Sequence, residues 1–452
     1  MGKLSFSVVI GKPELISPES QTPAEFKYLS NLDDQPGFRS HMPFIHYYNQ
    51  RRAGERRDPA TVIRRALSKA LVRYYPLAGR LRHGEKGKLV VDCCAEGVVF
   101  READADVTLD RLKLAAAGGL RPPSPFLSKF LLDDIWGSAF VIDSPLLRMQ
   151  VTRLKCGGFV LAYTVNHCMC DGYGVFQFIT AVSELAREPN RSDLTQPPVW
   201  ARELLTPRSP PRPSFPHREY DPDPNMEPDS SGSEIRDKTQ ISIFFTRSDI
   251  SALKSQINGP KTPTFVAITA LLWRAWTRSL GLRSETRLLV PIDTRGHHQP
   301  LLPVGYYGVA VVVSCAVAPA KELVSRPISF AGGLISELKS RGSDKEYRAS
   351  TVDFIETERR FWCRGEGTLV VTDVSKLRFA DVDFGWGPGL YGGFARGGVV
   401  DVAGLVVTTL SGYKREEDGV EGLVALLSLP REAVDAFQDE VHRGIAFRSA
   451  LL

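Results

Sequence analysis

Apolar residues recur along the chain with two spacings, one typical of helices and one typical of strands. In residues 59–75 and 264–280 they lie three or four positions apart, so both segments are predicted to be helices, and Thr264 is expected to cap the second. Short apolar runs predict strands at 88–92, 98–100, 159–165, 241–245, 287–291, 308–317, 368–371 and 423–429. Because helices and strands are interspersed in both halves, the pattern predicts a mixed α/β protein.

A polar stretch interrupts this pattern between residues 191 and 237. It holds ten prolines and almost no apolar periodicity, as expected of an extended connection over a surface. We therefore predict an N-terminal domain at 1–190, a crossover loop at 191–237 and a C-terminal domain at 238–452.

The most informative stretch surrounds His167. The apolar run 159–165 ends just before Asn166 and His167, and an Asp171-Gly172 turn follows. Apolar residues then recur at helical spacing at Val175, Phe178, Ile179, Val182 and Leu185. His167 is therefore expected at the end of a buried strand and before a helix, where a side chain can be held firmly yet face an opening.

Imidazole has an ordinary pKa of about 6.5, so His167 is a candidate general base at neutral pH. Asp171 is a candidate to orient the ring, or to brace the loop by pairing with an arginine. These residues alone leave open a purely structural histidine. A metal site built from His167, Cys168, Cys170 and Asp171 is disfavoured, because four ligands so close in sequence are too crowded around one tetrahedral ion.

Composition and charge exclude several classes of protein. With 43% hydrophobic and 24% charged residues, the chain is predicted to be globular. A net charge of +5, from 57 basic and 52 acidic residues, is too balanced to indicate nucleic acid. We interpret the one basic cluster as a solvated face rather than a phosphate site. It comprises Arg51, Arg52, Arg56, Arg57, Arg64, Arg65 and Arg73.

The seven cysteines are irregularly spaced, the first residues lack a secretory pattern, and no apolar run approaches the ~20 residues that span a bilayer. We therefore expect a cytoplasmic protein with free thiols and no membrane span.

A second unusual stretch is rich in glycine. The sequence Asp383-Phe-Gly-Trp-Gly387 opens it, and seven of the fourteen residues 385–398 are glycine. The stretch lacks the pattern of a phosphate-binding loop. Since it has little conformational preference of its own, its surroundings must hold its backbone.

Together, His167-Cys-Met-Cys-Asp171 and Asp383-Phe-Gly-Trp-Gly387 resemble the HxxxD and DFGWG motifs of the plant BAHD acyltransferase family. The order and spacing of the two motifs also match, and the resemblance covers essentially the whole chain. Further agreeing stretches are 75–81, 145–147, 156–159, 293–295 and 305–308.

The resemblance implies two domains of chloramphenicol-acetyltransferase-like fold, joined by a long crossover, with a channel between them. In that family coenzyme A and the acceptor meet at the histidine. This implies that His167 is the general base and that acyl-CoA is a co-substrate, with no permanently bound cofactor. Asp171, paired with Arg295, and Asp383 are expected to be structural. The expected partners are acyl-CoA and a small alcohol, and the protein is expected to be a monomer.

Two further sets of residues follow from the resemblance. Thr372 and the indole N–H of Trp386 are candidate donors to the oxyanion of the tetrahedral intermediate. Lys254, Lys261 and Thr264 precede or open a helix, which favours anions, and are candidates to bind coenzyme A.

Departures from the common family pattern indicate which branch of the family the chain resembles. Thr372-Asp373-Val374 stands where hydroxycinnamoyltransferases of shikimate or quinate carry Thr-Ser-Trp, and the extra carboxylate disfavours an anionic acceptor. The segments 305–310 and 13–48 resemble the alcohol and benzyl alcohol acyltransferases. We therefore expect direct transfer of a benzoyl, acetyl or similar group to an alcohol in plant specialised metabolism. The alternatives are an amine acceptor, a hydroxycinnamoyl donor, or a scaffold that has lost catalysis.

Overall fold

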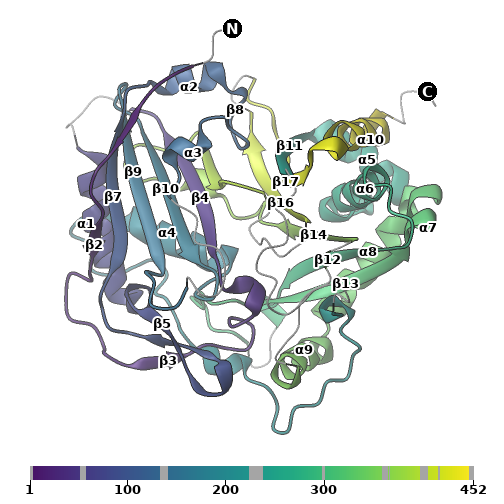
Figure 1. The fold of residues 1–452 in the computed structure, drawn as a ribbon, viewed down its shortest axis with the longest axis horizontal. Helices are drawn as coiled ribbons and strands as arrows, with labels where there is room; N and C mark the ends of the chain where they lie inside the picture. The colour runs from purple at the N-terminus through teal and green to yellow at the C-terminus, as the bar shows by residue number, and fades with distance from the viewer. Residues whose placement is uncertain are drawn as a thin grey trace. The chain divides into compact units, whose positions relative to one another are not determined.

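The computed structural model describes residues 4–50, 57–132, 141–222, 238–297, 301–358, 365, 367–397, 406–415 and 418–446 (Figure 1). They form two compact units. The first unit draws on Met1–Thr206, Leu302–Ala310 and Leu377–Arg396, and the second on Pro207–Leu301, Val311–Lys376 and Gly397–Leu452. The units thus interleave along the chain.

This interleaving bears on the predicted domain boundaries. Asp383–Gly387 lies in the first unit, whereas the sequence assigned it to a C-terminal domain. The predicted crossover, 191–237, contributes to both units up to residue 222, and residues 223–237 lie outside the described part of the chain. Arg51, Arg52, Arg56 and Cys363 also lie outside it.

A seven-stranded sheet is the centre of the first unit. The strand order is β1-β7-β9-β10-β4-β15, and β2 also pairs with β7. The bounds are β1 Val8–Ile10, β2 Glu14–Ile16, β4 His41–Tyr48, β7 Val98–Ala105, β9 Leu147–Leu154, β10 Phe159–Asn166 and β15 Tyr391–Phe394. All eight residues of both β4 and β10 are buried, which explains the continuous apolar run that predicts β10.

The described residues of the first unit also form a small sheet and several α-helices. The sheet has the order β3-β6-β5, with bounds β3 Phe26–Tyr28, β5 Arg80–His83 and β6 Leu89–Asp92, and β8 is Ala117–Leu120. The helices are α1 Pro59–Arg73, α2 Leu109–Ala115, α3 Leu127–Phe130 and α4 Gly172–Arg187. Asp58 caps α1 by accepting a hydrogen bond from the backbone of Thr61, and α1 packs against α4 and β9. The predicted helix at 59–75 is thereby confirmed.

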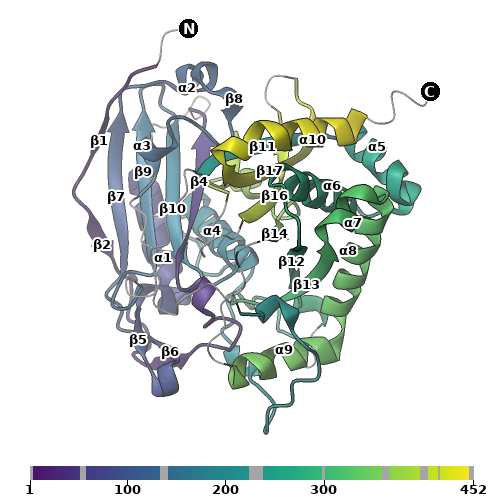
Figure 2. The same cartoon turned by 45° about the vertical axis from the view of Figure 1, so that its right-hand side comes forward.

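The second unit is built on a six-stranded sheet of order β11-β17-β16-β14-β12-β13. The bounds are β11 Lys238–Thr246, β12 Glu285–Asp293, β13 Val311–Pro319, β14 Thr368–Asp373, β16 Val406–Lys414 and β17 Glu421–Pro430. Its helices are α5 Arg247–Ile257, α6 Thr264–Ser279, α7 Ala320–Ser325, α8 Ile328–Ser343, α9 Lys345–Thr357 and α10 Val434–Ala446. Figure 2 shows α6 between α8 and α10, and its Trp273 and Trp276 are fully buried in the core.

Two local predictions for the second unit are wrong. Thr264 does not cap α6, because it is already the first helical residue; the capping position is Pro263, which offers no side-chain acceptor. The run 308–317 is not all strand, because β13 begins at Val311 and residues up to Ala310 belong to the first unit.

Candidate active site around His167

His167 follows the last residue of β10 and lies in a tight turn before α4. Asn166 accepts two hydrogen bonds within this turn. Its side-chain oxygen accepts from the backbone N–H of Cys168 at 3.0 Å, and its carbonyl accepts from Met169 at 3.0 Å. The backbone N–H of His167 donates to the carbonyl of Ser40 at 2.8 Å. The backbone at His167 is therefore held on both sides.

His167 is partly exposed as a residue, and its imidazole stacks on the ring of Phe38. The ring centroids are 4.1 Å apart and the planes differ by 9°. Within the described residues, Nδ1 is buried and has no hydrogen-bond partner. Burial lowers the pKa of His167 below its usual value, and the charge of Asp171 opposes this shift. The lowered pKa favours the neutral ring, which can accept a proton.

Asp171 is buried and caps α4. One carboxylate oxygen accepts from the backbone N–H of Gly174 at 3.0 Å, and the other accepts from that of Ala310 at 3.1 Å. A Cβ on Gly174 would overlap the carbonyl oxygen of Tyr307, so glycine is required for this close approach. Asp171 thus joins the His167 turn to the segment 302–310.

A buried ion pair adjoins the same turn. Arg202 and Asp33 have side-chain exposures of 2% and 0%, and Nε of Arg202 lies 3.1 Å from the carboxylate. Arg202 also donates through Nη2 to the carbonyl of Met169 at 2.8 Å. Asp33 accepts from the backbone N–H of Val309 at 2.9 Å. The sequence analysis assigned no chemistry to Asp33, Phe38 or Arg202, and no local pattern marks them.

The glycine-rich motif is held by its own aspartate. Asp383 accepts hydrogen bonds from the backbone of Gly385 at 2.6 Å and Gly387 at 2.8 Å. Both glycines have positive φ, +103° and +84°, which a side chain would oppose. Arg187 of α4 donates to the carbonyl of Asp383. These contacts hold the backbone of the glycine-rich motif, which has little conformational preference of its own.

Trp386 is not placed to act at His167. Its ring packs edge-on against Phe159, with centroids 5.3 Å apart, and Phe159 is the first residue of β10. His167 follows the other end of this strand, eight residues on, which at about 3.3 Å per residue is ~26 Å. The expectation that the indole donates to an oxyanion at His167 is therefore corrected. Trp386 packs at the far end of the strand.

The remaining predicted site residues belong to the second unit. Thr372 lies on β14 with a partly exposed side chain. Arg295 pairs with Asp293 at 3.1 Å, and because Asp171 belongs to the first unit, the predicted pairing with Asp171 stays a prediction. Lys254 in the last turn of α5, exposed Lys261, and Thr264 at the start of α6 lie in or beside one short connection. Their joint role in binding coenzyme A stays a prediction as well.

The basic cluster is partly neutralised. Arg64 pairs with Glu14 and Glu102, each at 2.9 Å, and Arg73 with Asp193 at 3.3 Å. Arg57 and Arg65 of the cluster line a surface hollow of about 280 Å³, together with Lys69. Ion pairs to three carboxylates fit the interpretation of this cluster as a solvated face.

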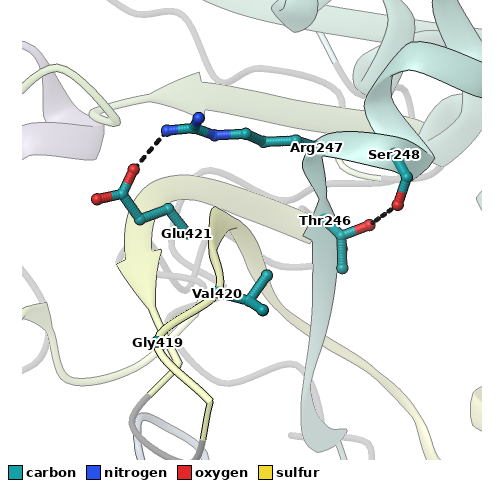
Figure 3. A pocket seen from close by; sticks show the side chains of 6 residues that line it. All are labelled: Thr246, Arg247, Ser248, Gly419, Val420 and Glu421. Carbon is teal, nitrogen blue, oxygen red and sulfur yellow. Dashed lines mark hydrogen bonds and ion pairs between the residues drawn. The ribbon is translucent and has the colours of Figure 1, made fainter.

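Figure 3 shows a second hollow, of about 310 Å³, in the second unit. Arg247 and Glu421 form an exposed ion pair at 2.5 Å across it, and the hydroxyls of Thr246 and Ser248 are 2.7 Å apart. None of the residues predicted to carry chemistry lines it. We therefore give it no part in the site.

Among the described residues, no three His, Cys, Asp or Glu side chains are grouped to hold a metal ion. The described cysteines are all free thiols. Within the same part of the chain, none of the helices combines the length and apolar character needed to cross a bilayer.

Comparisons with known proteins agree over nearly the full length. The chain matches the family described as "Transferase family" over residues 6–443. Benzyl alcohol O-benzoyltransferase of Nicotiana tabacum is 41% identical, over 97% of this chain and 94% of the relative. 13-Hydroxylupanine O-tigloyltransferase of Lupinus albus is also 41% identical, over 97% and 95%.

Solved structures share the fold. Vinorine synthase matches with a TM-score of 0.70 at 20% identity, over 95% of this chain and 96% of that one. F. sporotrichioides TRI101, solved with coenzyme A and T-2, matches with a TM-score of 0.65 at 15% identity, over 92% and 97%. The predicted α/β acyltransferase fold is thereby confirmed.

The family match and the named relatives define the chain as an acyltransferase. The chain belongs to the matched transferase family, and its predicted membership of the plant BAHD acyltransferases is confirmed.

Proposed function

We propose that this protein transfers an acyl group from a coenzyme A thioester to the hydroxyl of an alcohol, with His167 as general base. The observation that carries the proposal is the placement of the imidazole. His167 is partly exposed and its backbone is fixed at the end of β10, and burial lowers the pKa of the ring, which favours the neutral form.

The proposed reaction needs one proton acceptor and no other reagent. The His167 imidazole takes the hydroxyl proton while the alcohol oxygen attacks the thioester carbonyl carbon. The carbon–sulfur bond then breaks, and the departing thiolate takes the proton from the imidazolium. The products are an ester and free coenzyme A.

Direct transfer is favoured over an acyl-enzyme. Cys168 and Cys170, the thiols nearest to His167 in sequence, are buried. Burial raises the pKa of the Cys168 thiol well above its usual value, and the sulfur donates to the carbonyl of Phe38 at 3.3 Å. A protonated, hydrogen-bonded thiol is a poor nucleophile, so a ternary complex of enzyme, acyl-CoA and alcohol fits better.

The proposal extends to other predicted residues. Thr372 is proposed to stabilise the oxyanion, and Lys254, Lys261 and Thr264 to bind coenzyme A. Asp171 is proposed to be structural, since its carboxylate oxygens hold the backbone of Gly174 and Ala310. We further propose a monomer in the cytoplasm of a plant, with no permanently bound cofactor.

The names of the relatives support an alcohol acceptor. Those relatives are described as O-benzoyl and O-tigloyl transferases of alcohols, and each covers 97% of this chain. Exposed Asp373 would repel an anionic acceptor such as shikimate. We therefore propose a neutral alcohol, with benzoyl-CoA or acetyl-CoA as donor.

An acceptor screen tests the proposed function. Wild type is incubated with acetyl-, benzoyl- or coumaroyl-CoA and a panel of alcohols and amines, and free thiol and ester are both measured. Wild type is expected to form an ester, and His167→Ala to lose about 10²- to 10⁴-fold in kcat, the usual contribution of a general base.

His83→Ala is the matched control, because His83 is an exposed histidine at the end of β5. It is expected to keep wild-type turnover. Equal turnover by His167→Ala and wild type, with both folded by circular dichroism, would refute the assignment.

A further inference from the structure

Among the described residues, Nδ1 of His167 lacks the polar partner that usually fixes a catalytic histidine. In a serine-protease-like triad a carboxylate binds Nδ1 and sets the orientation of the ring. Here, within the described residues, Nδ1 is buried without a hydrogen-bond partner. The nearby Asp171 uses its carboxylate oxygens to hold the backbone of Gly174 and Ala310. Other contacts must therefore orient the ring.

The segment between Ser30 and Ser40 supplies these contacts. Phe38 covers one face of the imidazole at 4.1 Å, nearly parallel to it. The carbonyl of Ser40 accepts from the backbone N–H of His167 at 2.8 Å, and the carbonyl of Phe38 accepts from the thiol of Cys168 at 3.3 Å. This one segment thus contacts the ring of His167, the backbone of His167 and the side chain of Cys168.

Arg202 holds the same turn from its other end. Its Nη2 donates to the carbonyl of Met169 at 2.8 Å, two residues after His167. The guanidinium lies over the rings of Trp200, Tyr306 and Tyr307, 4.3–5.0 Å from their centroids. A cation so enclosed has little freedom to move, so it can act as a fixed anchor for the turn.

Asp33 links the two supports. It lies in the same segment as Phe38 and pairs with Arg202 at 3.1 Å while fully buried. Its other contacts are to the N–H of Val309 at 2.9 Å and to Ser30, whose N–H is 2.9 Å and hydroxyl 2.6 Å away. The carboxylate is therefore locked, and it fixes Arg202 relative to the segment that carries Phe38.

We propose that Phe38 and the Asp33–Arg202 pair are positioning residues for His167. This inference rests on the proposed function, because it assumes that His167 is the base. Phe38 fixes the plane of the ring, and Arg202, held by Asp33, fixes the turn that carries it. The ring is therefore oriented by stacking and by its backbone, since Nδ1 has no hydrogen-bond partner among the described residues.

Two conservative variants test the positioning role. Phe38→Leu keeps an apolar side chain but removes the flat ring. Arg202→Lys keeps the charge opposite Asp33 but removes the guanidinium fork that reaches both Asp33 and Met169. Each is expected to lower kcat about 10- to 100-fold, the loss typical of a misplaced catalytic group, while KM for acyl-CoA stays within about twofold.

The pKa of His167 gives a readout that needs no substrate. In protein with ¹⁵N-labelled histidine, each variant is expected to raise the pKa of His167 toward 6.5, because a loosened ring is better hydrated. Among the described residues, the charge that acts on the pKa of the ring is that of Asp171, which neither variant changes. Asp34 and Arg39, in the segment that carries Phe38, pair with each other at 2.8 Å.

Two control variants repeat these substitutions in the second unit. Phe330→Leu alters a partly exposed ring that lies under Arg326. Arg287→Lys alters a buried arginine that pairs with Asp221 at 3.0 Å and Glu285 at 2.9 Å. Both controls are expected to keep the kcat and the His167 pKa of wild type, even if they lose some stability.

The possible results separate the two proposals. If Phe38→Leu and Arg202→Lys keep both the kcat and the His167 pKa of wild type, the positioning role is refuted and the proposed function stands. A rise in KM with unchanged kcat would also refute it, since Phe38 would then be a substrate-binding residue. Unchanged turnover in His167→Ala would instead refute the proposed function.

Discussion

Gly308 shows how a residue without a side chain shapes the surroundings of Arg202. A Cβ at this position would overlap Nη1 of Arg202, which has no room to retreat between its three aromatic neighbours. The glycine at the end of the Gly305–Gly308 stretch is therefore explained by packing. It leaves the space in which the buried cation lies.

Gly308→Ala is expected to lower the free energy of unfolding by about 1–3 kcal/mol, the usual cost of forcing an extra carbon into a packed interior. It should also lower kcat, because Arg202 must shift. Urea unfolding measures the first effect. Gly296→Ala is the control, since a Cβ there meets nothing within 4 Å, and equal stability of the two variants would contradict the packing argument.

Among single residues, the sequence pointed to His167, the proposed base, but not to the residues that contact it. His167 could be found because its signals are local: an apolar run before it and an Asp-Gly turn and a helix after it. Arg202 lies in a proline-rich stretch typical of an exposed connection, yet it is 2% exposed. Its burial depends on Asp33 and on Tyr306, which are remote in sequence, so no local pattern could predict it.

At the scale of elements, long periodic or fully buried segments were predicted well. The structure confirms α1, α4, α6 and β10, whose apolar spacing reflects one buried face or two. The central strand β4 was missed. It contains Pro43, which usually argues against a central strand, and the buried polar residues His41 and His46.

The buried histidines of β4 make stability dependent on pH. Burial lowers the pKa of His41 to about 4 and that of His46 to about 3. The unfolded chain binds protons at these positions below about pH 6.5, whereas the folded protein binds them only near pH 4 and 3. The stabilisation is therefore complete above pH 6.5 and is lost as the pH falls toward 4 and 3, by about 1.4 kcal/mol per pH unit for each histidine.

His46→Gln is expected to reduce this slope by about 1.4 kcal/mol per pH unit between pH 6 and 5, whatever its effect on absolute stability. Urea unfolding at several pH values measures the slope. His83→Gln is the control, because His83 is exposed and should leave the slope unchanged. Parallel curves for wild type and His46→Gln would contradict the account of β4.

At the scale of the whole molecule, the chain path differs from a simple succession of domains. Strand β15 adds to the sheet of the first unit by pairing with β4, with Tyr391 opposite Tyr47, although some 340 residues separate them. The backbone N–H groups of Val309 and Ala310 likewise donate hydrogen bonds to residues remote in sequence, Asp33 and Asp171 respectively. Such long-range pairings leave no mark in local periodicity, which is why the sequence placed the glycine-rich motif in the wrong part of the fold.

The central claim is that a neutral imidazole at His167, with a pKa lowered by burial, removes the proton from the alcohol. The pH dependence of kcat/KM for wild type, compared with the NMR titration of His167, tests it most directly. We predict an acid limb with a midpoint below 6.5 that coincides with the His167 pKa. A midpoint well above 6.5, or an imidazole that is protonated at pH 7, would contradict the account.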